Sequence, residues 1–126
     1  MDNHHEDPLD ALGHALLGAY VLIGKLLGWL PLPIGLPPID EEDWDGLVAV
    51  AAIDRARIAV RDLPLDSLTA SIMDKLLLEW LTAHDLGVIT EVVGRDRWRL
   101  EALSYALSRI TSLAQLAESR LRPYED

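Results

Sequence analysis

The chain has 126 residues, of which half are hydrophobic and a quarter are charged. That size and composition predict one folded domain, with or without an appended helix, and argue against a wholly disordered chain. The absence of cysteine excludes disulfides, thiol catalysis and cysteine-ligated metal centres, and it fits the reducing cytoplasm, where we expect the protein to act. The formal net charge of −10 favours solubility and disfavours binding to nucleic acid.

The first predicted element is a helix over residues 8–30, begun by Asp7 as the capping residue and by Pro8 in the first turn. Leucine, isoleucine and alanine gather on one of its faces. Four glycines gather on or beside the opposite face, although glycine weakens a helix by about 1 kcal/mol relative to alanine. We therefore predict that another backbone approaches this helix closely, either within the fold or across a homodimer. The four are Gly13, Gly18, Gly24 and Gly28.

Residues 11–30 are also long and apolar enough to be considered as a membrane span. Lys25 lies inside the stretch and its hydropathy is borderline, so a helix buried between others in a dimer is the preferred interpretation. Prolines follow at positions 31, 33, 37 and 38 and predict an extended linker. The predicted organisation is an apolar helix with a proline-rich linker over residues 1–40, and a helical domain over residues 41–126.

Two interpretations compete for residues 44–63. As a helix, the stretch presents an apolar face opposite a charged one; as a strand, residues 55–61 alternate polar and apolar side chains. The acidic residues before Trp44 and the run of alanines favour the helix. The short connection that follows, up to Asp66, predicts a helical hairpin that leads into the next helix.

Residues 67–100 predict a buried helix followed by a β-hairpin. Apolar residues recur along the helix at three- and four-residue spacing, and Gly87 is a natural left-handed stop for it. The next residues, VITEVV, are rich in β-branched side chains that suit a strand, and the GRD that follows can turn the chain. The segment RWRL then alternates arginine with apolar residues, so we expect a hairpin over residues 88–100.

The last predicted element is a helix over residues 101–122, stopped by Pro123. Its apolar residues are spaced by four and three residues in alternation, which is typical of a coiled-coil seam. This seam fits a dimer interface and the core of a single subunit equally well. The predicted fold is therefore mainly α, with about four helices, one short β-hairpin and a C-terminal packing or dimerisation helix. The seam residues are Leu103, Leu107, Ile110, Ala114, Ala117 and Leu121.

A helix followed by LGVI and a short hairpin ending in RWRL resembles the recognition helix and wing of winged helix-turn-helix regulators. The resemblance covers residues 67–100 only. It implies a winged-helix-like domain, dimerised by its C-terminal helix, with Arg95, Arg97 and Arg99 on the wing as candidate DNA contacts. The matching residues are Leu77, Leu81, Leu86, Gly87, Val88, Ile89, Arg97, Trp98 and Leu100.

The sequence departs from that family in the helix that would enter the major groove. Asp74 and Glu79 would repel phosphate, and the side chains that read base edges are missing from this helix. The three arginines could contact phosphate or pair with the chain's own carboxylates, and in so acidic a chain the second alternative has more weight. DNA is therefore a disfavoured partner.

Histidines and carboxylates cluster near the start of the chain, and Asp10 and His14 lie one helical turn apart, where a divalent metal could use them. The spacing matches no metal motif, so solvation and helix capping are the preferred roles. The sequence contains no phosphate-binding loop, nucleophile elbow or catalytic carboxylate pair. We therefore predict no metal, no cofactor and no enzymatic activity. The cluster comprises His4, His5, Glu6, Asp7, Asp10 and His14.

The function predicted from these features is a non-enzymatic, winged-helix-like homodimer that binds another protein. A DNA-binding transcription regulator that uses the basic hairpin is the first alternative. An acidic inhibitor or adaptor, of the viral or mobile-element type, would instead occupy a basic surface on its partner. The remaining alternative is a small subunit anchored in a membrane by residues 11–30.

Overall fold

The computed structural model describes residues 7–38 and 45–122, and within these ranges it contains four α-helices and no β-strand. The prediction of a mainly α fold is confirmed. The stretch for which helix and strand competed forms a helix, as the alanine run favoured. The helices are α1 (Pro8–Gly28), α2 (Gly46–Arg61), α3 (Ser67–Val93) and α4 (Arg97–Leu121).

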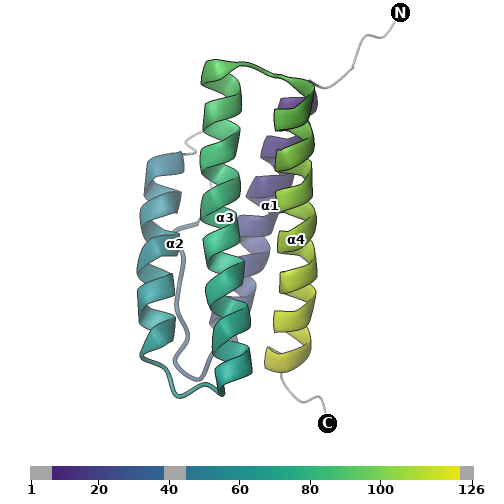
Figure 1. The fold of residues 1–126 in the computed structure, drawn as a ribbon. Coiled ribbons are helices and arrows are strands. Elements are labelled where there is room, and N and C mark those ends of the chain that lie inside the picture. Colours follow the sequence, from purple (N-terminus) through teal and green to yellow (C-terminus); the bar gives the residue numbers. More distant parts are fainter. Residues whose placement is uncertain (1–6, 39–44, 123–126) are drawn as a thin grey trace, which may run out of the picture.

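Helix α3 lies at the centre of the bundle and packs against each of the other three helices (Figure 1). It runs antiparallel to α1, α2 and α4, and α1 also packs alongside α4. Among the described helices, α2 packs against α3 alone. The bundle therefore consists of a compact group of α1, α3 and α4, with α2 attached to the free side of α3.

Three of the four helices begin with an aspartate whose carboxylate caps the first turn. The backbone N–H groups of Leu9 and Leu47 donate to Asp7 (3.0 Å) and Asp45 (2.9 Å), respectively. At the start of α3, the N–H of Thr69 donates to Asp66 (3.0 Å). Such caps satisfy N–H groups that have no partner inside the helix. The predicted start of α1 at Asp7 and Pro8 is confirmed.

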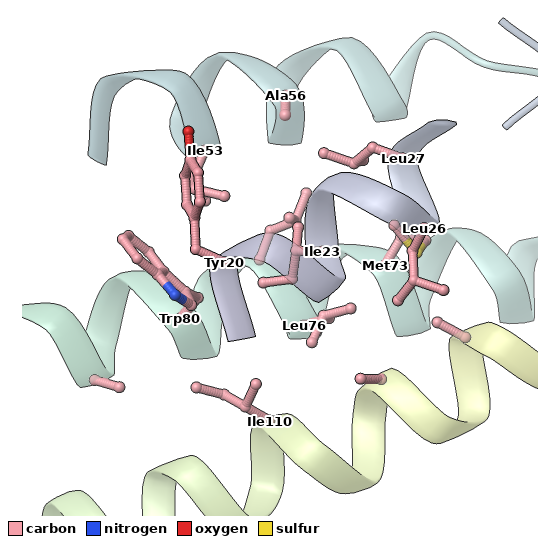
Figure 2. Packing of buried hydrophobic residues seen from close by; sticks show 14 of the residues in the cluster. Tyr20, Ile23, Leu26, Leu27, Ile53, Ala56, Met73, Leu76, Trp80 and Ile110 are labelled. Carbon is pink, nitrogen blue, oxygen red and sulfur yellow. The ribbon is translucent and has the colours of Figure 1, made fainter. Parts of the chain in front are cut away.

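One hydrophobic core joins all four helices, and Trp80 of α3 is its largest fully buried side chain. Figure 2 shows side chains of α1, α2, α3 and α4 pointing into the space between the helices. The indole N–H of Trp80 donates to the carbonyl of Leu16 (3.0 Å), and its ring lies 5.6 Å from the rings of Tyr20 and His84. The N-terminal helix α1 therefore shares one hydrophobic core with the three helices that follow it.

The linker after α1 packs against the bundle and fills the space between α1 and α2. Leu30 is buried, Ile34 and Leu36 are partly buried, and the Tyr20 hydroxyl donates to the carbonyl of Pro37 (2.9 Å). Burial raises the pKa of the Tyr20 phenol. Gly24 faces this linker: a Cβ at that position would lie 3.7 Å from Leu36. The linker thus meets α1 at Gly24 through the Leu36 side chain, at an ordinary contact distance, and not through its backbone.

The predicted β-hairpin over residues 88–100 is wrong. Helix α3 continues through Gly87 for six more residues, and residues 97–100 form the first turn of α4. Each β-branched residue costs a helix only a few tenths of a kcal/mol, roughly, which tertiary packing overrides. Thr90 illustrates this, because it is fully buried and its hydroxyl donates to the carbonyl of Leu86 (2.7 Å). The chain turns at Gly94, where φ is 155°.

The helical conformation at Gly87 predicts that Gly87→Ala stabilises the protein by about 0.5–1 kcal/mol, since alanine is the better helix former. The added methyl group would meet Leu103 at 3.8 Å, an ordinary contact. Urea unfolding followed by circular dichroism measures the change. Gly94→Ala is the matched control and should destabilise by about 1–3 kcal/mol, because its backbone conformation is essentially restricted to glycine. A loss of stability in Gly87→Ala would contradict the prediction and would indicate that Gly87 ends the helix in a left-handed conformation.

Asp66 joins the start of α3 to the end of α4. It accepts hydrogen bonds from the Thr69 hydroxyl (2.7 Å), the Thr69 N–H and the Arg120 guanidinium (3.0 Å). Arg120 also donates to the Thr69 hydroxyl (2.7 Å). The hydrogen bonds from Thr69, followed by the charge of Arg120, lower the pKa of Asp66 from 3.8 to about 2.

This lowered pKa makes Asp66 a source of acid sensitivity. Its contribution to stability is fully present above about pH 4 and is lost as the pH falls through the folded-state pKa of about 2. Asp66→Asn keeps an acceptor for the cap but has no carboxylate to protonate, so its urea midpoint should fall less between pH 4 and pH 2 than the wild-type midpoint. Asp54→Asn, on the exposed face of α2, should behave as wild type. Equal falls in all three proteins would contradict the prediction.

Candidate interaction surfaces

The three arginines expected on the wing are held by the chain's own carboxylates. Arg95 pairs with Asp7 at the start of α1, Arg99 pairs with Asp96, and Arg97 Nε lies 3.1 Å from Glu101 Oε1. Arg97 and Arg99 lie on a helix, so they do not share one face of a strand. The ion pairs reduce the positive charge that these side chains present to a phosphate backbone.

The seam residues of α4 lie in the interior of the subunit. Five of the six are buried and the sixth, Leu121, is partly buried against the same core. They face the side of α4 that packs on α1 and α3, so they are not exposed at the surface of the subunit. The five are Leu103, Leu107, Ile110, Ala114 and Ala117.

The predicted glycines of α1 divide into two groups. Gly24 packs on the linker, whereas a Cβ at Gly13, Gly18 or Gly28 would meet nothing within 4 Å. The last three therefore point away from the core.

In the described part of the chain, α1 is also the one helix long and apolar enough to cross a membrane, with 28% of its most apolar window buried in the subunit. This is weak support for a membrane span, because apolar core helices have the same length and hydropathy.

The predicted histidine and carboxylate cluster is only partly covered by the structure. Asp10 and His14 lie on the exposed side of α1, while His4, His5 and Glu6 lie outside the described residues. Within the described ranges, no group of three or more histidine, aspartate or glutamate side chains is arranged to hold a metal ion.

The first candidate surface, which we call the α3–α4 face, is the outward side of these two neighbouring helices (Figure 1). Residues 75, 78, 82, 85 and 89 of α3 are spaced by three or four residues and share one helical face, as do residues 105, 109, 112 and 116 of α4. A shallow groove of about 550 Å³ separates the two rows. It is lined by Lys75, Leu78, Glu79, Thr82, Tyr105, Ser108, Arg109, Ser112 and Leu113.

An ion pair and an aromatic ring lie at the centre of the α3–α4 face. Arg109 binds Glu79 through two hydrogen bonds (2.6 and 3.2 Å), and its guanidinium lies 4.4 Å from the centre of the Tyr105 ring. Hydrogen bonding to Glu79 raises the pKa of Arg109. Tyr105 is nevertheless 65% exposed and Leu78 is 43% exposed. The face thus presents large side chains in front of a fixed arginine, and tyrosine and arginine are among the residues that dominate protein interfaces.

The second candidate surface, the α1–α3 groove, lies where α2 does not reach α1. It has a volume of about 680 Å³ and is formed by the first half of α1 and the last turns of α3. His84 closes one side, and it is packed so tightly that a Cβ at Gly46 of α2 would lie 2.7 Å from its ring. The lining residues are Leu9, Asp10, Leu12, Gly13, His14, Leu16, Leu17, Ala83, His84, Gly87, Val88, Glu91 and Leu103.

Neither surface was identified from the sequence. Tyr105 and Leu116 lie opposite the seam of α4, where spacing predicts a polar, solvated face. The signal available was the presence of large apolar residues on that face, together with Leu78 and Ile89 on α3. The sequence contains no corresponding signal for the α1–α3 groove, because the groove depends on how α1, α2 and the linker pack around α3.

Comparison with known proteins yields no match to a protein-family model, to a curated protein or to a solved structure. The chemistry of the two surfaces therefore carries the functional argument.

Proposed function

We propose that this chain is a non-enzymatic protein-binding module that forms a homodimer through the α3–α4 face. The observation that carries the proposal is the set of large side chains left exposed on this face beside an ordered arginine. Exposed apolar patches of this kind are typical of protein interfaces. Leu78, Ile89, Tyr105 and Leu116 each expose between 43% and 65% of their surface.

The charge balance of the face supports a second copy as its partner. The chain carries a net charge of −10, so two copies repel each other over most orientations. The α3–α4 face contains two cations, Lys75 and Arg109, and two anions, Glu79 and Asp85. Contact through this face brings together surfaces that are neutral overall, and the acidic remainder of each copy stays apart.

The order of charges along α3 also fits a twofold axis. Lys75 and Asp85 lie five residues before and five residues after Trp80 on the same helix. Suppose that two α3 helices pack antiparallel, with the twofold axis crossing their outward sides at the level of residue 80. Lys75 of each copy then lies opposite Asp85 of the other. A twofold interface repeats every contact, so this arrangement forms two ion pairs. Lys75 has no ion-pair partner among the residues that the structure describes.

The carboxylates of the bundle support a structural role over a catalytic one. Asp66, Asp74 and Glu79 each pair with an arginine from a different helix, at 3.0, 2.9 and 2.6 Å, respectively. Such pairs connect neighbouring helices, and they hold these three carboxylates in structural contacts.

Sedimentation equilibrium of the wild type at micromolar concentration should give the mass of a dimer. Tyr105→Ala should raise the dimer dissociation constant about 30-fold, which corresponds to the loss of about 2 kcal/mol at a central aromatic residue. Ile58→Ala, an exposed residue on α2, is the matched control and should leave the mass unchanged. A wild-type protein that sediments as a monomer throughout would refute the dimer.

A charge exchange tests the predicted orientation of the dimer. Lys75→Asp and Asp85→Lys each place like charges opposite one another twice, so each should weaken the dimer by about tenfold or more. The double variant restores opposite charges and should recover the wild-type dissociation constant. Failure of the double variant to recover would exclude the antiparallel arrangement, even if the protein is a dimer.

A further inference from the structure

The geometry points to the α1–α3 groove as the binding site for a basic amphipathic helix of a partner protein. This site is distinct from the α3–α4 face, which involves the outward sides of α3 and α4. Binding of a partner helix in the groove is therefore independent of homodimer formation through the α3–α4 face.

The position of the groove is that of a helix missing from the bundle. Toward the end of α1, the linker covers the space between α1 and α2. Leu36 packs near Gly24, and the Pro37 carbonyl accepts a hydrogen bond from the Tyr20 hydroxyl. Toward the start of α1, the described residues leave the corresponding space open as the groove. Leu12, Leu16 and Leu17 line it and are only partly buried. A helix placed there would continue the cover that the linker provides.

The dimensions of the groove fit two to three turns of helix. Its walls extend from Leu9 to Leu17 on α1 and from Ala83 to Glu91 on α3, which is nine residues on each side. At about 1.5 Å per residue these walls are about 12 Å long, close to the span of apolar residues at positions i, i+3, i+4 and i+7 of a bound helix. Gly13 and Gly87 line the walls without side chains, so a second backbone can approach closely.

The charges at one end of the groove select a basic helix. Asp10 lies in the first turn of α1 and Glu91 in the last turn of α3, and these two ends meet where Asp7 pairs with Arg95. Neither Asp10 nor Glu91 forms an ion pair with a residue that the structure describes. A lysine or arginine at one end of the partner helix would complement both carboxylates, and the net charge of −10 favours the approach of a cationic partner.

A helix fits this groove better than a small polar molecule. Small-molecule sites usually place a few polar groups inside an enclosed pocket. Here the charged side chains Asp10 and Glu91 are exposed, and apart from His14 and His84 the remaining lining is leucine, valine, alanine and glycine. Among the described residues, no buried side-chain nitrogen or oxygen lacks a hydrogen-bond partner.

The test uses a fluorescent peptide with leucines on one helical face and arginines on its flanks, and a matched peptide with glutamate in place of each arginine. Fluorescence anisotropy with the full chain should show that the basic peptide binds and that the acidic peptide binds at least about tenfold more weakly. Amide chemical-shift changes should concentrate in residues 9–17 and 83–91. Absence of binding by the basic peptide, or equal binding by both peptides, would overturn the inference.

A second experiment measures peptide binding to variants in which the groove is filled. Gly13→Leu adds a side chain where a Cβ meets nothing within 4 Å, so it should fill the groove without disturbing the core and weaken peptide binding about tenfold or more. Gly18→Leu makes the same change in the same helix outside the groove lining and should bind as wild type. Asp10→Asn combined with Glu91→Gln should weaken binding and reduce its dependence on salt.

These outcomes separate the groove from the homodimer. Gly13→Leu should keep the oligomeric mass of the wild type, and Tyr105→Ala should keep peptide binding. If Gly13→Leu instead dissociates a dimer, a second copy occupies the groove and the inference is wrong. Peptide binding that is equal in Gly13→Leu and Gly18→Leu would likewise exclude the groove as the site.

Discussion

The structure depends on a central helix, α3, that carries buried apolar side chains along its length. A helix of this kind is stable in water only when other elements cover it, and α3 is covered by α1, α2 and α4. Trp80 shows how strong the constraint is, because this large side chain is fully buried while its N–H still finds the carbonyl of Leu16. The two candidate surfaces are the places where cover is incomplete: the α3–α4 face on one side, and the α1–α3 groove where α2 does not reach α1.

Much of the fold could be predicted from local sequence signals. Asp7 and Pro8 mark the start of α1, the alanine run marks α2, and the spacing of apolar residues marks the buried side of α4. The hairpin could not be excluded in this way. Residues 88–93 favour a strand locally, and a helix forms there because the end of α3 packs on α1 and α4, as the buried Thr90 shows. That packing connects segments far apart in the sequence, so short-range patterns carry little information about it.

The candidate surfaces were less predictable than the fold. The acidity of the chain correctly favoured internal ion pairs for Arg95, Arg97 and Arg99 over a basic surface. The spacing of the α4 seam fitted a core and a dimer equally well, and the packing of α4 on α1 and α3 decides that these residues are interior. Tyr105 becomes a candidate interface residue only because it lies beside the Arg109–Glu79 pair, and Glu79 comes from another helix. Sites that combine side chains of two helices need the pairing of those helices to be known.

The most direct test of the account is whether α3 is one continuous helix from Ser67 to Val93 in solution. Backbone carbon-13 chemical shifts, measured by nuclear magnetic resonance, report helix or strand residue by residue. We expect helical shifts through Gly87 to Val93, slow amide exchange at the buried Thr90, and a break only around Gly94. Strand-type shifts over residues 88–93, with cross-strand contacts to residues 97–100, would contradict it and would remove both surfaces as they are described.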